Sequence, residues 1–256
     1  MYIVFDTETT GLPKNWNAPI SDLDNWPRAI QIAWQVHDDM GNLVENKDFL
    51  IKPDGFDIPY DAERIHGIST ALAENEGVPL ADVLVEFEAA LKQAKFVVGQ
   101  NLQFDLNIMG AEHLRAEFES QMLEMPVLDT CTETTAALCQ IPGGRGGKWK
   151  LPTLTELHEY LFAHPFSEAH NATADVEATT RCFFELIRRE VFTQEELSVE
   201  ADYFTNFQKV HLDLIQNVGL KHVNLKEASK AYVSQETSGG LSDEEKARNI
   251  ELLKDA

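Results

Sequence analysis

The chain has 256 residues, 43% of them hydrophobic, and a formal net charge of −22 at pH 7. This is enough to bury a core, and we expect one large domain with an appendage. The acidity argues against a broad basic surface, so any bound nucleic acid would be short and held by metal ions or local basic patches. Three cysteines suit neither a zinc site nor a disulfide framework, which predicts a reducing, cytoplasmic setting. We expect no membrane association, because the chain has neither an apolar run of about eighteen residues nor a signal-peptide layout at its start.

The first residues, from Tyr2 to Leu12, begin with an apolar run of β-branched and aromatic side chains that predicts a buried strand. Asp6 and Glu8 lie two positions apart, so on a strand their side chains point to the same face. Two like charges on a buried face are unfavourable unless something neutralises them. Hard divalent cations such as Mg²⁺ or Mn²⁺ neutralise paired carboxylates well. A solvated acidic face on an edge strand explains this short motif equally well.

A long polar loop follows, and we expect its two tryptophans to pin it to the body of the protein rather than to stack on bases. Residues 29–38 and 43–51 then predict two strands that form an antiparallel hairpin beside the first strand. The remaining predicted elements are a helical turn at 61–65, helices at 79–94, from 103, at 152–162 and at 172–191, and short strands at 96–99 and 127–130. This order predicts an α/β fold with a mixed central sheet flanked by helices on both faces.

The later part of the chain holds two segments of different character. Residues 143–150 are rich in glycine and carry three cations, Arg145, Lys148 and Lys150. They lack the P-loop pattern, and a phosphate contact and a solvated loop remain open alternatives.

Beyond residue 191 the pattern changes, because residues 194–218 look helical and residues 222–256 are polar. We therefore expect a catalytic domain over residues 1–191. A helical C-terminal extension and tail would then occupy residues 192–256.

Three further residues join Asp6 and Glu8 in a candidate site. Asp105 lies on the first turn of a predicted helix, directly after a buried strand. Asp175 lies near the N-terminus of the long helix at 172–191, where the helix dipole favours negative charge. His170 precedes it on a loop and is free to face the site from the other side.

The ordered set resembles the DEDDh, or DnaQ-like, family of 3′–5′ exonucleases. The residues that carry the resemblance are Asp6-x-Glu8 within Phe5–Leu12, the segment Asn101-x-x-Phe104-Asp105, His170-x₄-Asp175, His66-Gly67-Ile68 and Asp129-Thr130. It runs from residue 2 to about residue 190. Gln100 departs from the family, whose members often have histidine there, and we expect this to change local hydrogen bonds rather than catalysis. The long insertion and basic loop also look like exonuclease domains found with bacterial replicative polymerases, including DNA polymerase III.

The resemblance implies a ribonuclease H-like fold and hydrolysis of phosphodiester bonds at 3′ ends of single-stranded DNA, in replication proofreading beside a replicative polymerase. It implies two divalent metal ions, Mg²⁺ or Mn²⁺, bridged by Asp6, with His170 as general base. The implied metal ligands are Asp6, Glu8, Asp105 and Asp175. The implied contacts with the terminal nucleotide are Thr7, Thr9, Leu12, His66, Asn101 and Phe104. For Phe104 a core role, and for His66 a capping role, stay equally open.

Three alternatives compete with this interpretation. An RNA-trimming 3′–5′ exoribonuclease of the same family would share the whole motif set. A non-catalytic domain that keeps the fold for partner binding is disfavoured, because all five acidic and histidine positions are intact. An unrelated metal phosphatase is disfavoured by the His170-x₄-Asp175 spacing and by the Asn101–Asp105 segment.

Overall fold

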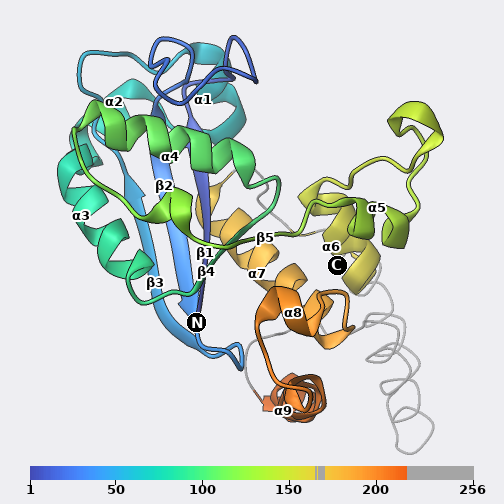
Figure 1. Ribbon diagram of the computed structural model, residues 1–256. Helices are drawn as coiled ribbons and strands as arrows, with labels where there is room; N and C mark the ends of the chain where they lie inside the picture. Colours follow the sequence, from blue (N-terminus) through green and yellow to red (C-terminus); the bar gives the residue numbers. More distant parts are fainter. Residues whose placement is uncertain (165, 167–170, 218–256) are drawn as a thin grey trace, which may run out of the picture.

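The computed structural model describes residues 1–164, 166 and 171–217. Within these residues five strands form a mixed sheet in the order β3-β2-β1-β4-β5 (Figure 1). The strands are β1 Tyr2–Thr9, β2 Ala29–His37, β3 Leu43–Leu50, β4 Phe96–Gly99 and β5 Val127–Asp129. The hairpin of β2 and β3 pairs antiparallel with β1, whereas β4 and β5 run parallel to β1. The predicted hairpin and mixed sheet are therefore confirmed.

Helices cover both faces of the sheet, and the side chains of β1 alternate between them. Ile3 and Phe5 belong to a hydrophobic cluster with α3 and α4 on one face, whereas Tyr2 and Val4 pack with α6 and α7 on the other (Figure 1). The helices are α1 Tyr60–His66, α2 Thr70–Glu76, α3 Leu80–Leu91, α4 Gln103–Arg115, α5 Glu133–Cys139, α6 Leu154–Phe162, α7 Ala172–Arg188, α8 Gln194–Leu197 and α9 Tyr203–Asn217, with short 3-10 turns η1 Met122–Glu124 and η2 Arg145–Gly147. This arrangement confirms the predicted α/β class.

The packed face of α7 agrees with the helical periodicity of its sequence. Its predicted members are all buried: Val176, Thr179, Cys182, Phe183, Leu186 and Ile187. Cys182 is a fully enclosed core thiol, as expected. The long helix is thus held against the sheet along its length, which fixes the direction of its N-terminal turn.

The structure differs from the sequence prediction at short helices. Both α2 and α5 have seven residues, and each begins at a capping side chain, Ser69 or Thr132. Helices this short owe their stability to caps and tertiary packing rather than to periodicity, which explains why the pattern did not reveal them. The predicted helical region 194–218 is not continuous, because Ser198 adopts a left-handed conformation, with φ 51°, that ends α8.

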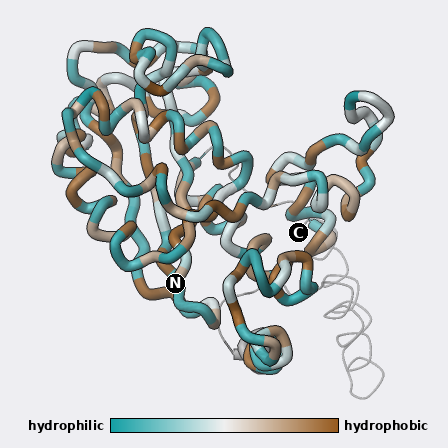
Figure 2. The backbone as a smooth tube through the Cα atoms, in the orientation of Figure 1, coloured by the Kyte–Doolittle hydropathy of each residue, from teal (hydrophilic) through white to brown (hydrophobic). Residues whose placement is uncertain are grey.

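The elements after residue 191 pack on the same core as the strands. Phe192, Leu197 and Phe207 lie in one hydrophobic cluster with Tyr2, and the Tyr203 hydroxyl donates to the Asp39 carbonyl at 2.6 Å. The tube of α9 alternates between hydrophobic and hydrophilic residues in Figure 2, as expected for a helix with one packed face. Among the described residues, every helix is too short or too polar to cross a membrane.

Candidate active site

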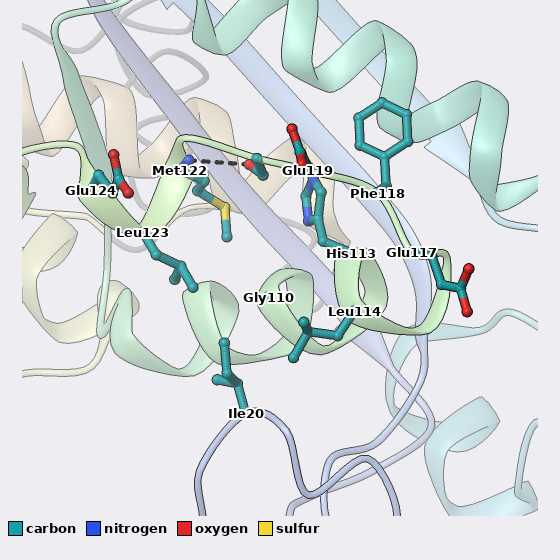
Figure 3. A pocket seen from close by; sticks show the side chains of 11 residues that line it. Ile20, Gly110, His113, Leu114, Glu117, Phe118, Glu119, Met122, Leu123 and Glu124 are labelled. Atoms are coloured by element: carbon teal, nitrogen blue, oxygen red, sulfur yellow. Dashed lines mark hydrogen bonds between the residues drawn. The ribbon is translucent and has the colours of Figure 1, made fainter.

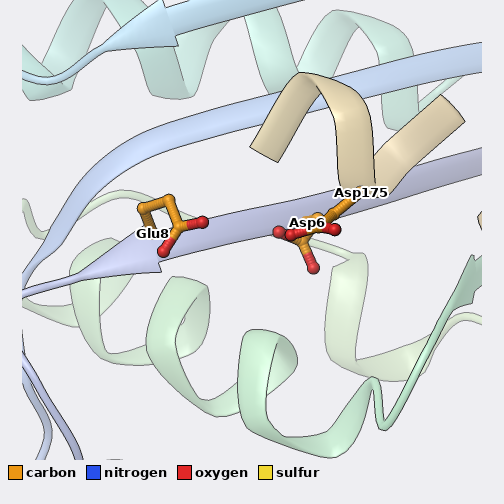
Figure 4. A group of neighbouring side chains, drawn as sticks. All are labelled: Asp6, Glu8 and Asp175. Carbon is orange, nitrogen blue, oxygen red and sulfur yellow. The ribbon is translucent and has the colours of Figure 1, made fainter. Parts of the chain in front are cut away.

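An acidic cluster lies where β1 meets the start of α7. The alternation along β1 puts Asp6 and Glu8 on the face that α7 covers. One carboxylate oxygen from each of Asp6, Glu8 and Asp175 lies within 4.8 Å of the other two (Figure 4). The fold therefore brings together acids that are about 170 positions apart in the chain.

Asp105 joins this cluster from α4. Its side chain is only 4% exposed. Its Oδ1 accepts two hydrogen bonds from Thr7, one from the backbone N–H at 3.0 Å and one from the hydroxyl at 2.6 Å. Thr7 stands between Asp6 and Glu8 on β1, so this pair of bonds fixes the Asp105 carboxylate beside both.

The carboxylates raise one another's pKa. Burial, and after it the charges of three neighbouring carboxylates, raise the pKa of Asp6 well above its usual range. Burial, then Asp175 and Asp105, raise the pKa of Glu8 to about 8. Burial also raises the pKa of Asp105 to about 7, although the hydrogen bonds from Thr7 oppose this. An acidic cluster of this kind is relieved by protons or by a hard cation with oxygen ligands, so the donor set fits divalent metal ions.

The first turn of α7 is fixed by its own cap and by a contact with β3. The Asn171 side chain accepts hydrogen bonds from the backbone N–H groups of Thr173 and Ala174. The Thr173 hydroxyl donates to Asp48 at 2.7 Å, and Gln31 on β2 donates to the same carboxylate at 2.9 Å. An asparagine ahead of a periodic helix is a recognisable capping signal, but nothing in the sequence relates Asp48 to Thr173. The predicted general base, His170, lies outside the described residues.

The Asp129-Thr130 motif shapes the loop between β4 and α4. The Asp129 carboxylate accepts from the backbone N–H groups of Asn101 and Leu102, both at 2.9 Å. Asn101 is held there in the left-handed region, at φ 56°. Gln100, where the family often has histidine, donates to the Pro152 carbonyl at 2.8 Å and accepts from the Thr130 hydroxyl. The departure at Gln100 thus falls in a local hydrogen-bond network, as expected.

The remaining predicted substrate contacts differ in their exposure and in their local hydrogen bonds. Thr9 is buried and donates from its hydroxyl to the Gly11 carbonyl at 2.7 Å, whereas Leu12 is 74% exposed. The His66 Nδ1 accepts from the Ile68 N–H at 3.0 Å, which is the local cap considered above. Its enclosed Nε2 makes no hydrogen bond of good geometry among the described residues; burial lowers the pKa of the ring, and the nearby backbone of Thr9 opposes this.

The two tryptophans of the polar loop behave differently. Trp26 is 3% exposed and its ring N–H donates to the Pro19 carbonyl, so it pins the loop as predicted. Trp16 is 55% exposed, and its ring lies 5.7 Å from that of Phe104 at an angle of 45°. Trp16 thus touches the body at Phe104 but leaves much of its ring open to solvent, so its predicted pinning role stays a prediction.

Two of the three cations of the glycine-rich loop form ion pairs with acids of neighbouring helices. Lys148 pairs with Glu133 at 3.0 Å and Lys150 with Glu156 at 2.6 Å. Both ion pairs are partly or fully exposed to solvent. These bonds favour the solvated-loop interpretation of this segment over a dedicated phosphate contact.

A cavity of about 610 Å³ lies elsewhere, at the C-terminal half of α4 (Figure 3). It is lined by Ile20, Gly110, His113, Leu114, residues 117–120 and residues 122–124. None of the predicted site residues lines it. The candidate active site is therefore the acidic cluster and not this cavity.

Comparison with known proteins identifies the family of this chain. The family model RNase_T, described as exonuclease, matches residues 3–183, and the chain belongs to this family of nucleases. Its predicted membership in the DnaQ-like exonucleases, a family of enzymes that hydrolyse phosphodiester bonds, is confirmed.

The similar proteins are DNA polymerases and an exonuclease. The chain is 30% identical over 237 residues to the PolC-type DNA polymerase III of Streptococcus thermophilus, and 28% identical over 228 residues to that of Streptococcus pneumoniae. These matches cover 92% and 89% of this chain but only 14% and 13% of the relatives. A crystal structure of E. coli Exonuclease I in complex with a dT13 oligonucleotide shares the fold, with a TM-score of 0.58 and 22% identity over 77% of this chain and 42% of that chain. The predicted ribonuclease H-like fold is thereby confirmed.

Proposed function

We propose that the protein is a metal-dependent 3′–5′ exonuclease that removes nucleotides from the 3′ ends of single-stranded DNA. The observation that carries the proposal is the convergence of Asp6, Glu8 and Asp175 within 4.8 Å, with Asp105 bonded to the intervening Thr7. These four acids come from three elements, and each raises the free energy of the others' charged forms. Such a cluster does not stabilise the fold, which favours a role in binding cations.

In this proposal the four carboxylates hold two divalent cations, Mg²⁺ or Mn²⁺, with Asp6 between them. Such a pair supplies an activated water and neutralises charge on the phosphate. Glu8 and Asp175 complete the donor set from β1 and α7, and Asp105 does so from α4. Residue His170 stands directly before the Asn171 cap, and it accepts the proton of the attacking water as general base.

Single-stranded DNA is favoured as the substrate by the similar proteins. The relatives are DNA polymerases of the PolC type, and Exonuclease I was solved with dT13 and dA16 oligonucleotides. A grip on only a few terminal nucleotides also suits a chain with a net charge of −22. The terminal nucleotide would contact Leu12, His66, Asn101 and Phe104, together with the backbone near Thr7 and Thr9.

We further propose a proofreading role in the cytoplasm beside a replicative polymerase. The catalytic domain would span residues 1–191 and the extension residues 192–256. The polymerase link is supported by the PolC relatives, whose length this chain covers only in small part.

Digestion of a 5′-labelled oligonucleotide tests the proposal. Single-stranded DNA and RNA of one sequence are incubated with Mg²⁺ or Mn²⁺, with EDTA, and with an Asp175→Ala variant. We expect a ladder of products that shorten from the 3′ end, formed faster from DNA than from RNA. The ladder should be absent with EDTA and in the Asp175→Ala variant. Glu177→Ala is a matched control, because Glu177 is an exposed acid on the same helix, paired with Arg181 at 3.8 Å.

Other outcomes would lead to other functions. Faster shortening of RNA would replace the DNA substrate by RNA and indicate an RNA-trimming enzyme. Absence of cleavage in the presence of bound metal would indicate a non-catalytic, partner-binding domain.

A further inference from the structure

The loop of residues 11–27, named here the Trp16 loop, begins and ends at the edge of the acidic cluster. Thr10 and Arg28 flank it and are bonded to each other, through the Thr10 N–H to the Arg28 carbonyl and the Arg28 N–H to the Thr10 hydroxyl, both at 2.9 Å. Thr10 follows Glu8 by two positions on the chain. Both ends of the loop are therefore fixed next to the strand that carries Glu8.

Internal bonds give the Trp16 loop a defined shape. The side chain of Asn25, which is 6% exposed, accepts from the Asn15 N–H at 2.7 Å and donates to the Asn15 carbonyl at 3.0 Å. The Ala18 N–H donates to the Asn15 carbonyl at 3.3 Å, which closes a tight turn around Trp16. A buried asparagine thus fixes the backbone on which Trp16 is carried.

The same loop is anchored to α4. The Arg115 guanidinium donates to the carbonyls of Leu23 and Trp26 at 2.6 and 2.7 Å. Ile20 lies over Gly110 (Figure 3), where an added Cβ would come within 3.3 Å of the Ile20 side chain. The absence of a side chain at Gly110 lets the loop approach the helix closely. Since α4 also carries Asp105, the loop and the acidic cluster share one rigid support.

Trp16 is not used by this anchoring. Its ring is 55% exposed and stands beside Phe104, the residue directly before Asp105. A rigid, exposed indole is well suited to stack on a nucleobase, and such stacking is independent of base identity.

Resting on the proposed exonuclease function, we propose that Trp16 is a second stacking surface, which holds a base upstream of the terminal nucleotide. Phe104 directly precedes Asp105 in the chain, and the ring of Trp16 lies 5.7 Å from that of Phe104. The strand would therefore pass from the acidic cluster over Phe104 to Trp16. This subsite binds an unpaired nucleobase of any identity and takes no part in the chemical step.

A substitution at Trp16 separates this subsite from catalysis. Trp16→Ala lowers the kcat/KM for a single-stranded oligonucleotide by roughly tenfold to a hundredfold, since each stacked base contributes about 1–3 kcal/mol to binding. Trp16→Phe retains most of the activity. The p-nitrophenyl ester of thymidine 5′-monophosphate has one nucleoside and cannot reach Trp16, so its hydrolysis stays within twofold of the native rate. Trp149→Ala is the matched control, because Trp149 is the other exposed tryptophan of four, at 45%.

A walk of abasic sites along the oligonucleotide locates the subsite. In the native protein, an abasic site at one position upstream of the 3′ terminus weakens binding in Ca²⁺. The Trp16→Ala variant binds the intact oligonucleotide and the one with an abasic site at that position equally well. Equal losses in the Trp16 and Trp149 variants, or additive effects at every abasic position, would overturn the subsite. If neither the oligonucleotide nor the ester is hydrolysed by the native protein, the proposed function itself fails.

Discussion

Helix α4 carries two buried carboxylates in opposite electrostatic surroundings. Asp105, on its first turn, meets other carboxylates at the acidic cluster, and burial raises its pKa to about 7. Glu112, two turns later, is fully buried and accepts from Arg28 at 2.9 Å, from Arg115 at 3.1 Å and from the Ala29 N–H at 2.9 Å. One acid is neutralised by the protein's own cations, and the other is not.

This difference separates a structural acid from a functional one. Glu112 joins β2, α4 and the Trp16 loop, so its charge stabilises the fold. The cluster of Asp6, Glu8, Asp105 and Asp175 places acids together, so at neutral pH the folded chain has to bind protons or a cation there, and without a cation this lowers its stability. A buried acid whose charged neighbours are also acids therefore indicates a site for an external cation.

The largest expected effect comes from neutralising the cluster. Asp6→Asn lowers the exonuclease rate by about 10³-fold, because in the proposed mechanism the Asp6 carboxylate holds the cations, which are worth several kcal/mol of charge stabilisation. In EDTA the same variant melts at a higher temperature than the native protein, since one of the opposed charges is gone. Measurements on one preparation test both the lower rate and the higher melting temperature. A lower melting temperature in EDTA would contradict the view that the cluster is repulsive without metal.

At Glu112 we expect the opposite result, a loss of stability with little effect on activity. Glu112→Gln destabilises the protein by about 3 kcal/mol, because it leaves two partly buried arginines without their counter-charge. Hydrolysis of the mononucleotide ester should be unchanged at temperatures where the variant is folded. Urea denaturation gives the stability, and Glu119→Gln on the exposed turn after α4 is the control.

The pH dependence of stability should also differ between the metal-free protein and the protein with Mg²⁺. The pKa of Glu8 is raised in the folded protein from 4.5 to about 8. A carboxyl group with a raised folded-state pKa contributes stability that is present below pH 4.5 and is lost as the pH rises towards 8. In EDTA the melting temperature should fall by on the order of 5 °C between pH 5 and pH 8 from this source. Mg²⁺ should raise it more at pH 8 than at pH 6, and a Glu8→Gln variant should show a smaller fall. An identical pH profile in that variant would assign the fall to other groups.

The comparison also shows what the sequence could predict. The two-residue period of a strand was enough to put Asp6 and Glu8 on one face, and helical periodicity gave the packed face of α7. Partners distant in the chain were not predictable, because nothing local relates Thr7 to Asp105 or Arg28 to Glu112. The same holds for the two loop tryptophans, which look alike in sequence. Their opposite exposures depend on the Asn25 and Arg115 contacts, which only the folded chain reveals.

Substitution of Asp48 should have the smallest effect. It tests whether an acid outside the buried cluster supports the site without binding a cation. It is an exposed acid, yet it receives hydrogen bonds from Thr173 and Gln31, and Gln31 lies opposite Glu8 in the sheet. Asp48 should therefore position the first turn of α7, which carries Asp175, without meeting a cation itself. Asp48→Ala should raise the Mg²⁺ concentration for half-maximal activity by about tenfold, the lower end of the range for residues that orient metal ligands.

Asp48→Asn provides the discriminating control, because its amide oxygen can still accept the Thr173 hydroxyl while the charge is lost. If positioning is the role of Asp48, the Asn variant keeps the native Mg²⁺ requirement and the Ala variant does not. Thermal melts in EDTA should be alike for both, since an exposed hydrogen bond contributes little to global stability. If the Asn variant shows the same raised Mg²⁺ requirement as the Ala variant, the charge of Asp48 acts on the cations directly. The group of acids that serves the metal would then extend beyond the buried cluster to the surface of β3.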